Sequence, residues 1–185
     1  MTRSITLALL VVLGLPGQAQ PSTQRLKLKQ VYTSQLYVRE AHNRNDGPEV
    51  EAYQRGGGGQ PNSAWCSWFV SWCFRRSGVR TAYFGRARSW FDASHVVLNH
   101  GRQVPSQPTP QPGDVVGYEW GHPAVSHVGF LDLWGVAATC QTVEGNTGGG
   151  RQSRDGDGVY KNWRLKSQVA YVANVIDNPT YRRGE

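Results

Sequence analysis

The sequence has few cysteines, a shortage of acidic residues and no long apolar run beyond its first residues. It contains three Cys among 185 residues, and its 13 Asp and Glu stand against 20 Lys and Arg, which gives a net charge of +7. No segment after the start is apolar over enough residues to span a bilayer, so we expect no stable membrane insertion. The odd number of cysteines leaves at least one thiol unpaired or linked to another molecule.

Metal-binding motifs are also missing. The chain has no Cys-x-x-Cys pair, and the separation of His122 from His127 differs from that of a His-Glu-x-x-His zinc site. Asp155-Gly156-Asp157 resembles a fragment of a calcium loop but lacks the ligand run of an EF-hand. We therefore expect neither a metal nor another cofactor.

The positive charge favours anionic partners, and cell-wall polymers, membrane surfaces and nucleic acids are all of this kind. However, Lys and Arg are scattered along the chain, with only short pairs such as Arg75-Arg76 and Arg182-Arg183. No basic stripe interleaved with aromatic residues is present, which argues against nucleic-acid binding.

The first residues are typical of a secretory signal peptide. Arg3 supplies the charged start, residues 5–15 the apolar run, and Gly17-Gln18-Ala19 the small-x-small cleavage site. A buried N-terminal helix is the alternative, but residues 13–17 contain the helix breakers Gly and Pro. We expect residues 1–19 to be removed and the protein to be secreted or periplasmic. Without Arg3 the net charge changes from +7 to +6.

Residues 20–185 are of a suitable length for one domain with a sizeable core, followed by a short basic tail. The first half is helical in pattern, with expected helices at 26–38, 48–54, 64–77 and 87–93. The second half is strand-like, with expected strands at 114–120, 126–134, 136–143, 159–163 and 169–176. Helices followed by strands predict an α+β fold, in which an antiparallel sheet of about five strands packs against a central helix.

The expected central helix contains an unusual segment, SAWCSWFVSWCF, at residues 63–74. It holds two of the three cysteines and three of the seven tryptophans. Its helical periodicity predicts burial on most sides, with only Ser67, Ser71 and Arg75 left for water. The segment could be an ordinary core helix, half of a disulfide framework, or the surroundings of a reactive thiol.

Cys66 is the best candidate for a reactive thiol. If Ser63 caps the helix, Cys66 lies in the first turn, where the helix dipole lowers a thiol pKa and enriches the nucleophilic thiolate. Free N–H groups at a helix start can also bind a developing oxyanion. Cys73 lies two turns later and lacks these advantages.

A nucleophilic cysteine needs a base, and the base needs an orienting partner. Among five histidines, His127 begins a strand, and strand alternation places Gly129 on the same face, which leaves room for a helix or substrate. On the next strand Glu144 and Asn146 share a face, and either could hold the imidazole. Each residue alone is more often structural, so the hypothesis depends on their combination.

The stretches AWCSWFVSWCFRRSG, PQPGDVVGYEW, SHVGFL, TVEGNTGGG and GDGVYKNWR resemble the CHAP family of cysteine, histidine-dependent amidohydrolases and peptidases, over residues 30–176. The resemblance implies a papain-like fold with Cys66 as nucleophile and His127 as general base and acid. It also implies Glu144 as the orienting carboxylate and Asn146 as the polar residue that follows it.

The resemblance further implies that the protein cleaves an amide bond of bacterial peptidoglycan through a thioester, and we expect it to act as a monomer. Which bond is cut stays open. The alternative is a cell-wall-binding module without turnover that uses exposed tryptophans, with Trp90, Trp120, Trp134 and Trp163 as candidates. A disulfide between Cys73 and Cys140, which would leave Cys66 free, is a further hypothesis.

Overall fold

The structure is a computed structural model that describes residues 21–149 and 155–178. The expected signal peptide, residues 1–19, and the pair Arg182-Arg183 lie outside the described residues. The helices are α1 (Thr23–Thr33), α2 (Pro48–Gly56), α3 (Cys66–Arg76) and the short 3-10 helices η1 (Ala87–Trp90) and η2 (Lys166–Gln168). The strands are β1 (Val96–Asn99), β2 (Arg102–Gln103), β3 (Val115–Tyr118), β4 (His127–Leu133), β5 (Thr139–Thr147), β6 (Gly158–Leu165) and β7 (Tyr171–Ala173).

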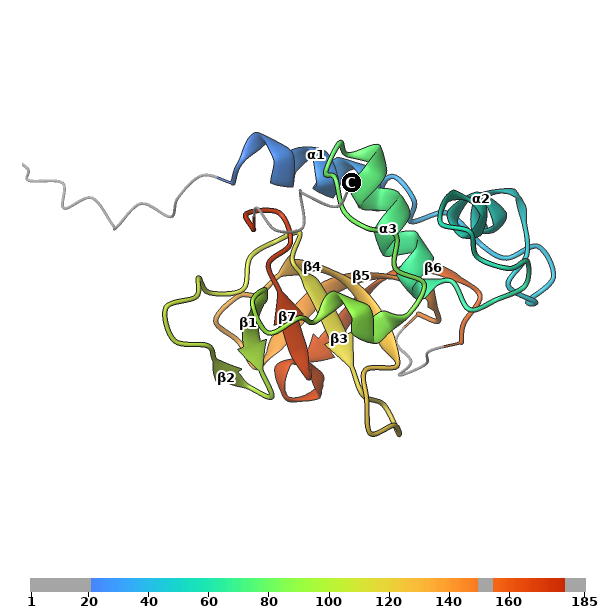
Figure 1. Cartoon of the computed structure of the whole chain (residues 1–185). Helices are drawn as coiled ribbons and strands as arrows, with labels where there is room; N and C mark the ends of the chain where they lie inside the picture. Colours follow the sequence, from blue (N-terminus) through green and yellow to red (C-terminus); the bar gives the residue numbers. More distant parts are fainter. Residues whose placement is uncertain (1–20, 150–154, 179–185) are drawn as a thin grey trace, which may run out of the picture.

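The strands form one antiparallel sheet in the order β2-β1-β7-β3-β4-β5-β6. Figure 1 shows α1 and α3 lying over one face of this sheet. The α+β class is therefore confirmed, as is the order of helices before strands. No helix among the described residues has the length and apolar character needed to cross a membrane.

The expected number of about five strands was wrong, because the described residues form seven. The two unforeseen strands, β1 and β2, are joined by His100 and Gly101, whose φ angles of 45° and 76° suit a two-residue hairpin turn. β1 is fixed in the sheet by pairing with β7, near the other end of the chain. That long-range pairing leaves no signal in the local sequence pattern.

Two apolar clusters lie on opposite faces of the sheet. The larger lies between the helices and the sheet and contains alternate strand residues such as Val115, Phe130 and Val143. The smaller contains their strand neighbours on the other face, such as Val116 and Leu131. Strand alternation places successive side chains on opposite faces, so the sheet separates the two clusters.

The expected disulfide between Cys73 and Cys140 was wrong, because all three cysteines are free. Cys73 belongs to the cluster beneath the helices, whereas Cys140 belongs to the cluster on the other face. The sheet therefore lies between the two thiols. Cys140 is on the face of β5 that points away from α3, and the sequence pattern alone did not reveal on which face the helix packs.

The expected water-facing strip on α3 was also wrong at two positions. Ser67 and Ser71 are buried, and both hydroxyls donate to the carbonyl oxygen of Phe84. The segment after α3 folds back along the helix and covers them. Ser67 also accepts a hydrogen bond from the indole of Trp90, at 2.9 Å.

Helix boundaries agree with expectation for α2, which begins at Pro48, and differ for α1. α1 starts earlier, at Thr23, with the Ser22 side chain accepting from the Arg25 N–H, and it ends at Thr33 rather than Val38. The Thr33 hydroxyl bonds back to the carbonyl of Lys29, and the chain then leaves the helix axis.

Candidate active site

Cys66 is the first residue of α3, not the third as the expected Ser63 cap implied. The Ser63 hydroxyl instead donates to the carbonyl of Gln60 within the preceding turn. Trp65 occupies the cap position without a side-chain cap bond. Cys66 is therefore even closer to the positive end of the helix than predicted, with its own N–H among those that the helix leaves unused.

The start of α3 lies directly against β5 because Gly145 has no side chain. A Cβ atom at Gly145 would lie 2.7 Å from the ring of Trp65 and 2.8 Å from that of Phe69. Both distances are too short for real carbon atoms, so glycine is required here for the helix to approach the sheet. This close packing brings Cys66 to the end of the β4–β5 pair.

His127 begins β4 and is fully buried. The regular pairing of β4 with β5 starts at Phe130 and Val143, so His127 lies beyond the paired stretch. Its Nε2 is 3.1 Å from Oε2 of Glu144. Among the described residues, Nδ1 has no conventional hydrogen-bond partner, and it is the ring nitrogen left for the Cys66 thiol.

Gly129 is what allows Glu144 to reach His127. A Cβ atom at Gly129 would lie 2.6 Å from Cγ of Glu144 and 2.7 Å from the carbonyl oxygen of Val143. The expected space beside His127 is thus present, but the carboxylate side chain fills it rather than a helix or a substrate. The absence of a side chain at Gly129 on β4 therefore makes room for Glu144 on β5.

The electrostatics favour a thiolate–imidazolium pair. Burial would raise the pKa of the Cys66 thiol, but hydrogen bonding to His127 and its charge outweigh burial and lower it; the N–H groups of Val128 and Ser67 also bond to the sulfur. Burial would lower the pKa of His127, yet Cys66 and Glu144 together raise it to about 9. The lowered pKa of the thiol and the raised pKa of the imidazole both favour an anionic sulfur beside a protonated ring.

Glu144 remains ionised although it is fully buried. Burial opposes its charge, but His127 and Arg164 hold the pKa of Glu144 at about 2. The Thr142 hydroxyl also donates to Oε1 at 2.6 Å. This carboxylate is well placed to fix the imidazole tautomer and stabilise the imidazolium.

Arg164 was missed by the sequence reasoning. Its guanidinium donates from Nε to Oε1 of Glu144 at 2.8 Å and from Nη2 to Oε2 at 2.7 Å. The strand expected at residues 159–163 ended at Trp163, whereas β6 continues to Leu165. Extending the alternation by one residue would have placed Arg164 on the same face as Tyr160 and Asn162.

Asn146 is close to the nucleophile but does not hold the imidazole. The β5–β6 register shifts between Glu144 and Thr147, and Asn146 has a φ of 57°. With its amide oriented to satisfy its neighbours, Asn146 accepts from the Trp65 N–H at 3.2 Å and donates to Asn45 and Gly156. The bulge breaks the strand alternation, so Glu144 and Asn146 do not share a face as expected.

An aromatic stack covers the imidazole. The ring of Trp120 lies 5.1 Å from that of His127 at an interplanar angle of 18°, and Tyr118 stacks on Trp120 at 4.4 Å. Of the tryptophans considered for sugar binding, Trp90 is fully buried, Trp120 and Trp134 are half-buried, and Trp163 is 61% exposed. Trp120 therefore shields the histidine from solvent.

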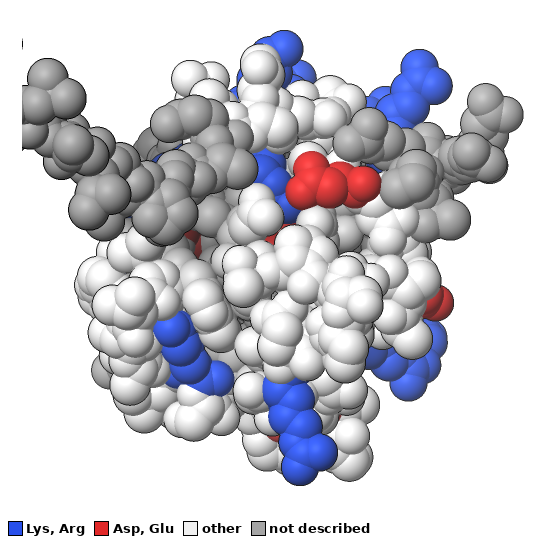
Figure 2. All heavy atoms as spheres, turned by 90° about the vertical axis from the view of Figure 1, so that its left-hand side faces the viewer, with Lys and Arg blue, Asp and Glu red and all other residues white. Residues whose placement is uncertain are grey.

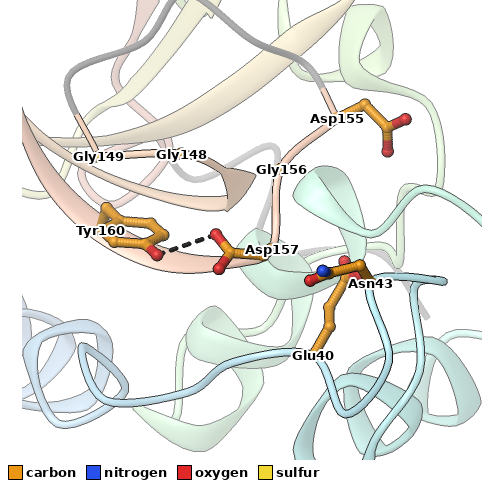
Figure 3. A pocket seen from close by; sticks show the side chains of 8 residues that line it. All are labelled: Glu40, Asn43, Gly148, Gly149, Asp155, Gly156, Asp157 and Tyr160. Atoms are coloured by element: carbon orange, nitrogen blue, oxygen red, sulfur yellow. Dashed lines mark hydrogen bonds between the residues drawn. The ribbon is translucent and has the colours of Figure 1, made fainter.

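A pocket of about 480 Å³ lies between the segment that joins α1 to α2 and the residues around the end of β5 and the start of β6. It is lined by Glu40, Asn43, Gly148, Gly149, Asp155, Gly156, Asp157 and Tyr160. Figure 3 shows Glu40 and Asn43 on one side and Asp157, bonded to Tyr160, on the other. Glu40 links the pocket to the site because its Oε1 accepts from the indole of Trp65, at 2.8 Å.

Within residues 21–149 and 155–178, no group of three or more His, Cys, Asp or Glu side chains is arranged to hold a metal ion. Asp157 accepts a hydrogen bond from Tyr160 and lines the pocket with Asp155.

Comparison with known proteins gives one family match. Residues 57–146 match the family model described as CHAP domain, which includes all four residues predicted for the site. This confirms the resemblance drawn from the sequence and indicates an amidase or peptidase of the peptidoglycan hydrolase kind. No match was found among curated proteins or among solved structures.

Proposed function

From the premise that residues 57–146 form a CHAP domain, we propose that the protein is a cysteine amidohydrolase or endopeptidase that cleaves an amide bond of peptidoglycan through a thioester. The observation that carries the proposal is the line of contacts from Cys66 through His127 to Glu144. A sulfur at a helix start, a buried imidazole and an ionised carboxylate are the parts that this chemistry requires.

In the first half of the reaction, the Cys66 thiolate attacks the amide carbonyl carbon and forms a C–S bond. The negative charge moves to the carbonyl oxygen, where the N–H groups at the start of α3 can stabilise it. The C–N bond then breaks, and the imidazolium of His127 gives its proton to the departing amine. The product is a thioester on Cys66 and a free amine.

In the second half, the neutral imidazole of His127 takes a proton from water, which attacks the thioester carbonyl. The C–S bond breaks, a carboxylic acid leaves, and the thiolate–imidazolium pair is restored. Glu144 stays ionised throughout and stabilises each protonated state of the ring.

We further propose that the chain works outside the cytoplasm after loss of residues 1–19, as one papain-like domain over residues 20–185, acting as a monomer. A peptidoglycan wall carries carboxylates, and the chain carries an excess of Lys and Arg. Figure 2 shows Lys and Arg at several separate places on one face rather than in a stripe. This distribution fits diffuse attraction to an anionic polymer.

The test is digestion of purified peptidoglycan with residues 20–185 and with the Cys66→Ser variant, followed by mass analysis of the fragments. We expect new amino and carboxyl termini only from the unsubstituted protein, and His127→Ala to lose turnover as well. Cys73→Ser is the matched control, since Cys73 lies on the same helix outside the site, and it should retain cleavage.

A wall-binding module without turnover is the second candidate, favoured by the 61% exposure of Trp163. In that case the unsubstituted protein would sediment with peptidoglycan but release no fragments, and Cys66→Ser would behave identically. Trp163→Ala would then lose binding, whereas the hydrolase proposal requires cleavage that depends on Cys66.

A further inference from the structure

The side chain of Arg164 reaches the site from β6, beyond the residues that match the family. It is 3% exposed and forms two parallel hydrogen bonds with Glu144, one to each carboxylate oxygen. Its guanidinium also lies 4.9 Å from the ring centre of Trp120, which stacks on His127. Arg164 thus contacts both the orienting carboxylate and the ring that covers the imidazole.

Each element around Glu144 contributes an ionisable group. Tyr118 comes from β3, His127 from β4 and Arg164 from β6, and Cys140 is on β5 itself, while Cys66 from α3 contacts His127. Burial raises the pKa of the Tyr118 hydroxyl well above its ordinary value, and it raises that of Cys140 to about 11. These two groups are therefore neutral over the working pH range. Cys66, His127, Glu144 and Arg164 determine the charge of the cluster.

We propose that Arg164 is a positioning residue of this active site, which binds both oxygens of Glu144 and so holds an ionised carboxylate in line with the imidazole of His127. The proposal rests on the proposed function for its catalytic consequence. A planar guanidinium is suited to this task because its two N–H groups match the two carboxylate oxygens, whereas a lysine provides only a point charge.

The charge balance of the cluster supports this role. With the imidazole protonated and the thiol ionised, Arg164 and His127 contribute two positive charges, and Glu144 and Cys66 contribute two negative charges. Without Arg164, ionising the thiol would leave a net negative charge in a buried site. The thiolate would then form only at higher pH, and the imidazolium would also keep its proton to higher pH.

The experiment measures the rate at which iodoacetamide alkylates Cys66 as a function of pH, read by mass from the peptide that carries it. In Arg164→Met we expect the pH of half-maximal rate to rise by about one unit or more, since a removed neighbouring charge acts at close range. Arg164→Lys keeps the charge and should shift less. It should nevertheless lower kcat, because the two-point contact with Glu144 is lost.

The matched control is Arg25→Met. Arg25 is likewise 3% exposed and paired with carboxylates, those of Asp114 and Asp177, but it lies outside the site. A merely structural Arg164 would behave like Arg25, with a lowered melting temperature and an unshifted alkylation profile. A folded Arg164→Met with the profile of the unsubstituted protein would overturn the proposal.

If Arg164→Met does not fold, the folded Arg164→Lys variant tests the proposal instead. Unchanged kcat and an unchanged profile in a folded Arg164→Lys would show that two-point binding of Glu144 is not needed, which contradicts the proposal. The alkylation measurement needs no turnover. Failure of the proposed function would appear separately, as an unsubstituted protein that alkylates as described but releases no fragments from peptidoglycan.

Discussion

At the scale of single residues, the site depends on three ionised side chains that are almost completely shielded from water. Cys66 is 6% exposed, and His127 and Glu144 are fully buried. Isolated charges at such positions would be neutralised by proton transfer. They persist because each charge has an opposite partner within hydrogen-bond reach. Under the proposed function, the pair of Cys66 and His127 is the group whose ionisation governs activity.

This ionisation predicts a bell-shaped pH dependence of kcat/KM. The lowered pKa of the Cys66 thiol marks the acid limb, since activity requires the thiolate and is lost as pH falls through that value. The raised pKa of His127, about 9, marks the alkaline limb, because the leaving amine needs the imidazolium proton. The measurement is the initial rate on soluble peptidoglycan fragments from about pH 4 to about pH 11, a range that covers the titration of thiols and imidazoles. It should record both limbs.

A Glu144→Gln variant serves as the comparison, since its amide cannot stabilise the imidazolium by charge. Its alkaline limb should move to lower pH, toward the ordinary value of a histidine. An alkaline limb that stayed in place in this variant would show that Glu144 does not control the ring.

The sequence predicted the three central side chains because each carries a local signal. Cys66 lies at the start of a helix pattern, His127 at the start of a strand, and Glu144 on the strand that follows. Asn146 was also predicted, but its contact with Trp65 depends on the bulge in β5, which the alternation did not foresee. Arg164 was not predicted, because its position depends on the exact end of β6. Residue types and alternation therefore identified three side chains that the structure brings together, but not the contacts around them.

At the scale of elements, one buried arginine of α1 contacts two segments that are far away in the sequence. Arg25 donates to Asp114 at 2.9 Å, to Asp177 at 2.6 Å, to Asn174 at 3.0 Å and to the carbonyl of Pro112 at 2.8 Å. These partners belong to the segment before β3 and to the segment after β7. A single side chain thus joins the first helix to two distant parts of the chain.

Arg25→Met is expected to lower the free energy of unfolding by about 3–5 kcal/mol, because it leaves the buried carboxylate of Asp114 without its partner. The loss should appear in chemical denaturation monitored by tryptophan fluorescence. The double variant Arg25→Met with Asp114→Leu should recover part of it, because no buried charge is then left alone. A single variant as stable as the unsubstituted protein would contradict this view of α1.

The element boundaries show where local patterns stop being informative. α2 begins at the proline that the sequence marks, because proline fixes the first helical position. α3 begins after Trp65 rather than at the serine cap, because the Trp65 N–H is satisfied by Asn146 from β5. Tertiary contacts thus replaced the local cap, and no local pattern contains them.

At the scale of the whole molecule, the fold follows from the order of its patterns, helices first and strands afterwards. The seven-strand sheet with β7 between β1 and β3 does not follow, since it needs a pairing between residues far apart in the sequence. Whether Cys73 and Cys140 form a disulfide could not be predicted from the sequence for the same reason. The side of the sheet on which α3 packs decides whether Cys73 and Cys140 can meet, and they lie on opposite sides.

This architecture predicts that the folded protein has one reactive thiol and two inert ones. Burial raises the pKa of Cys73 well above its ordinary value and that of Cys140 to about 11, whereas that of Cys66 is lowered. A brief exposure to iodoacetamide near neutral pH should therefore add one label per chain, located on Cys66, and three labels after denaturation. Reducing agent should leave the melting temperature unchanged, because no disulfide stabilises the fold. Only one label after denaturation without reductant would mean that Cys73 and Cys140 are joined, and the placement of the two clusters on opposite faces of the sheet would then be wrong.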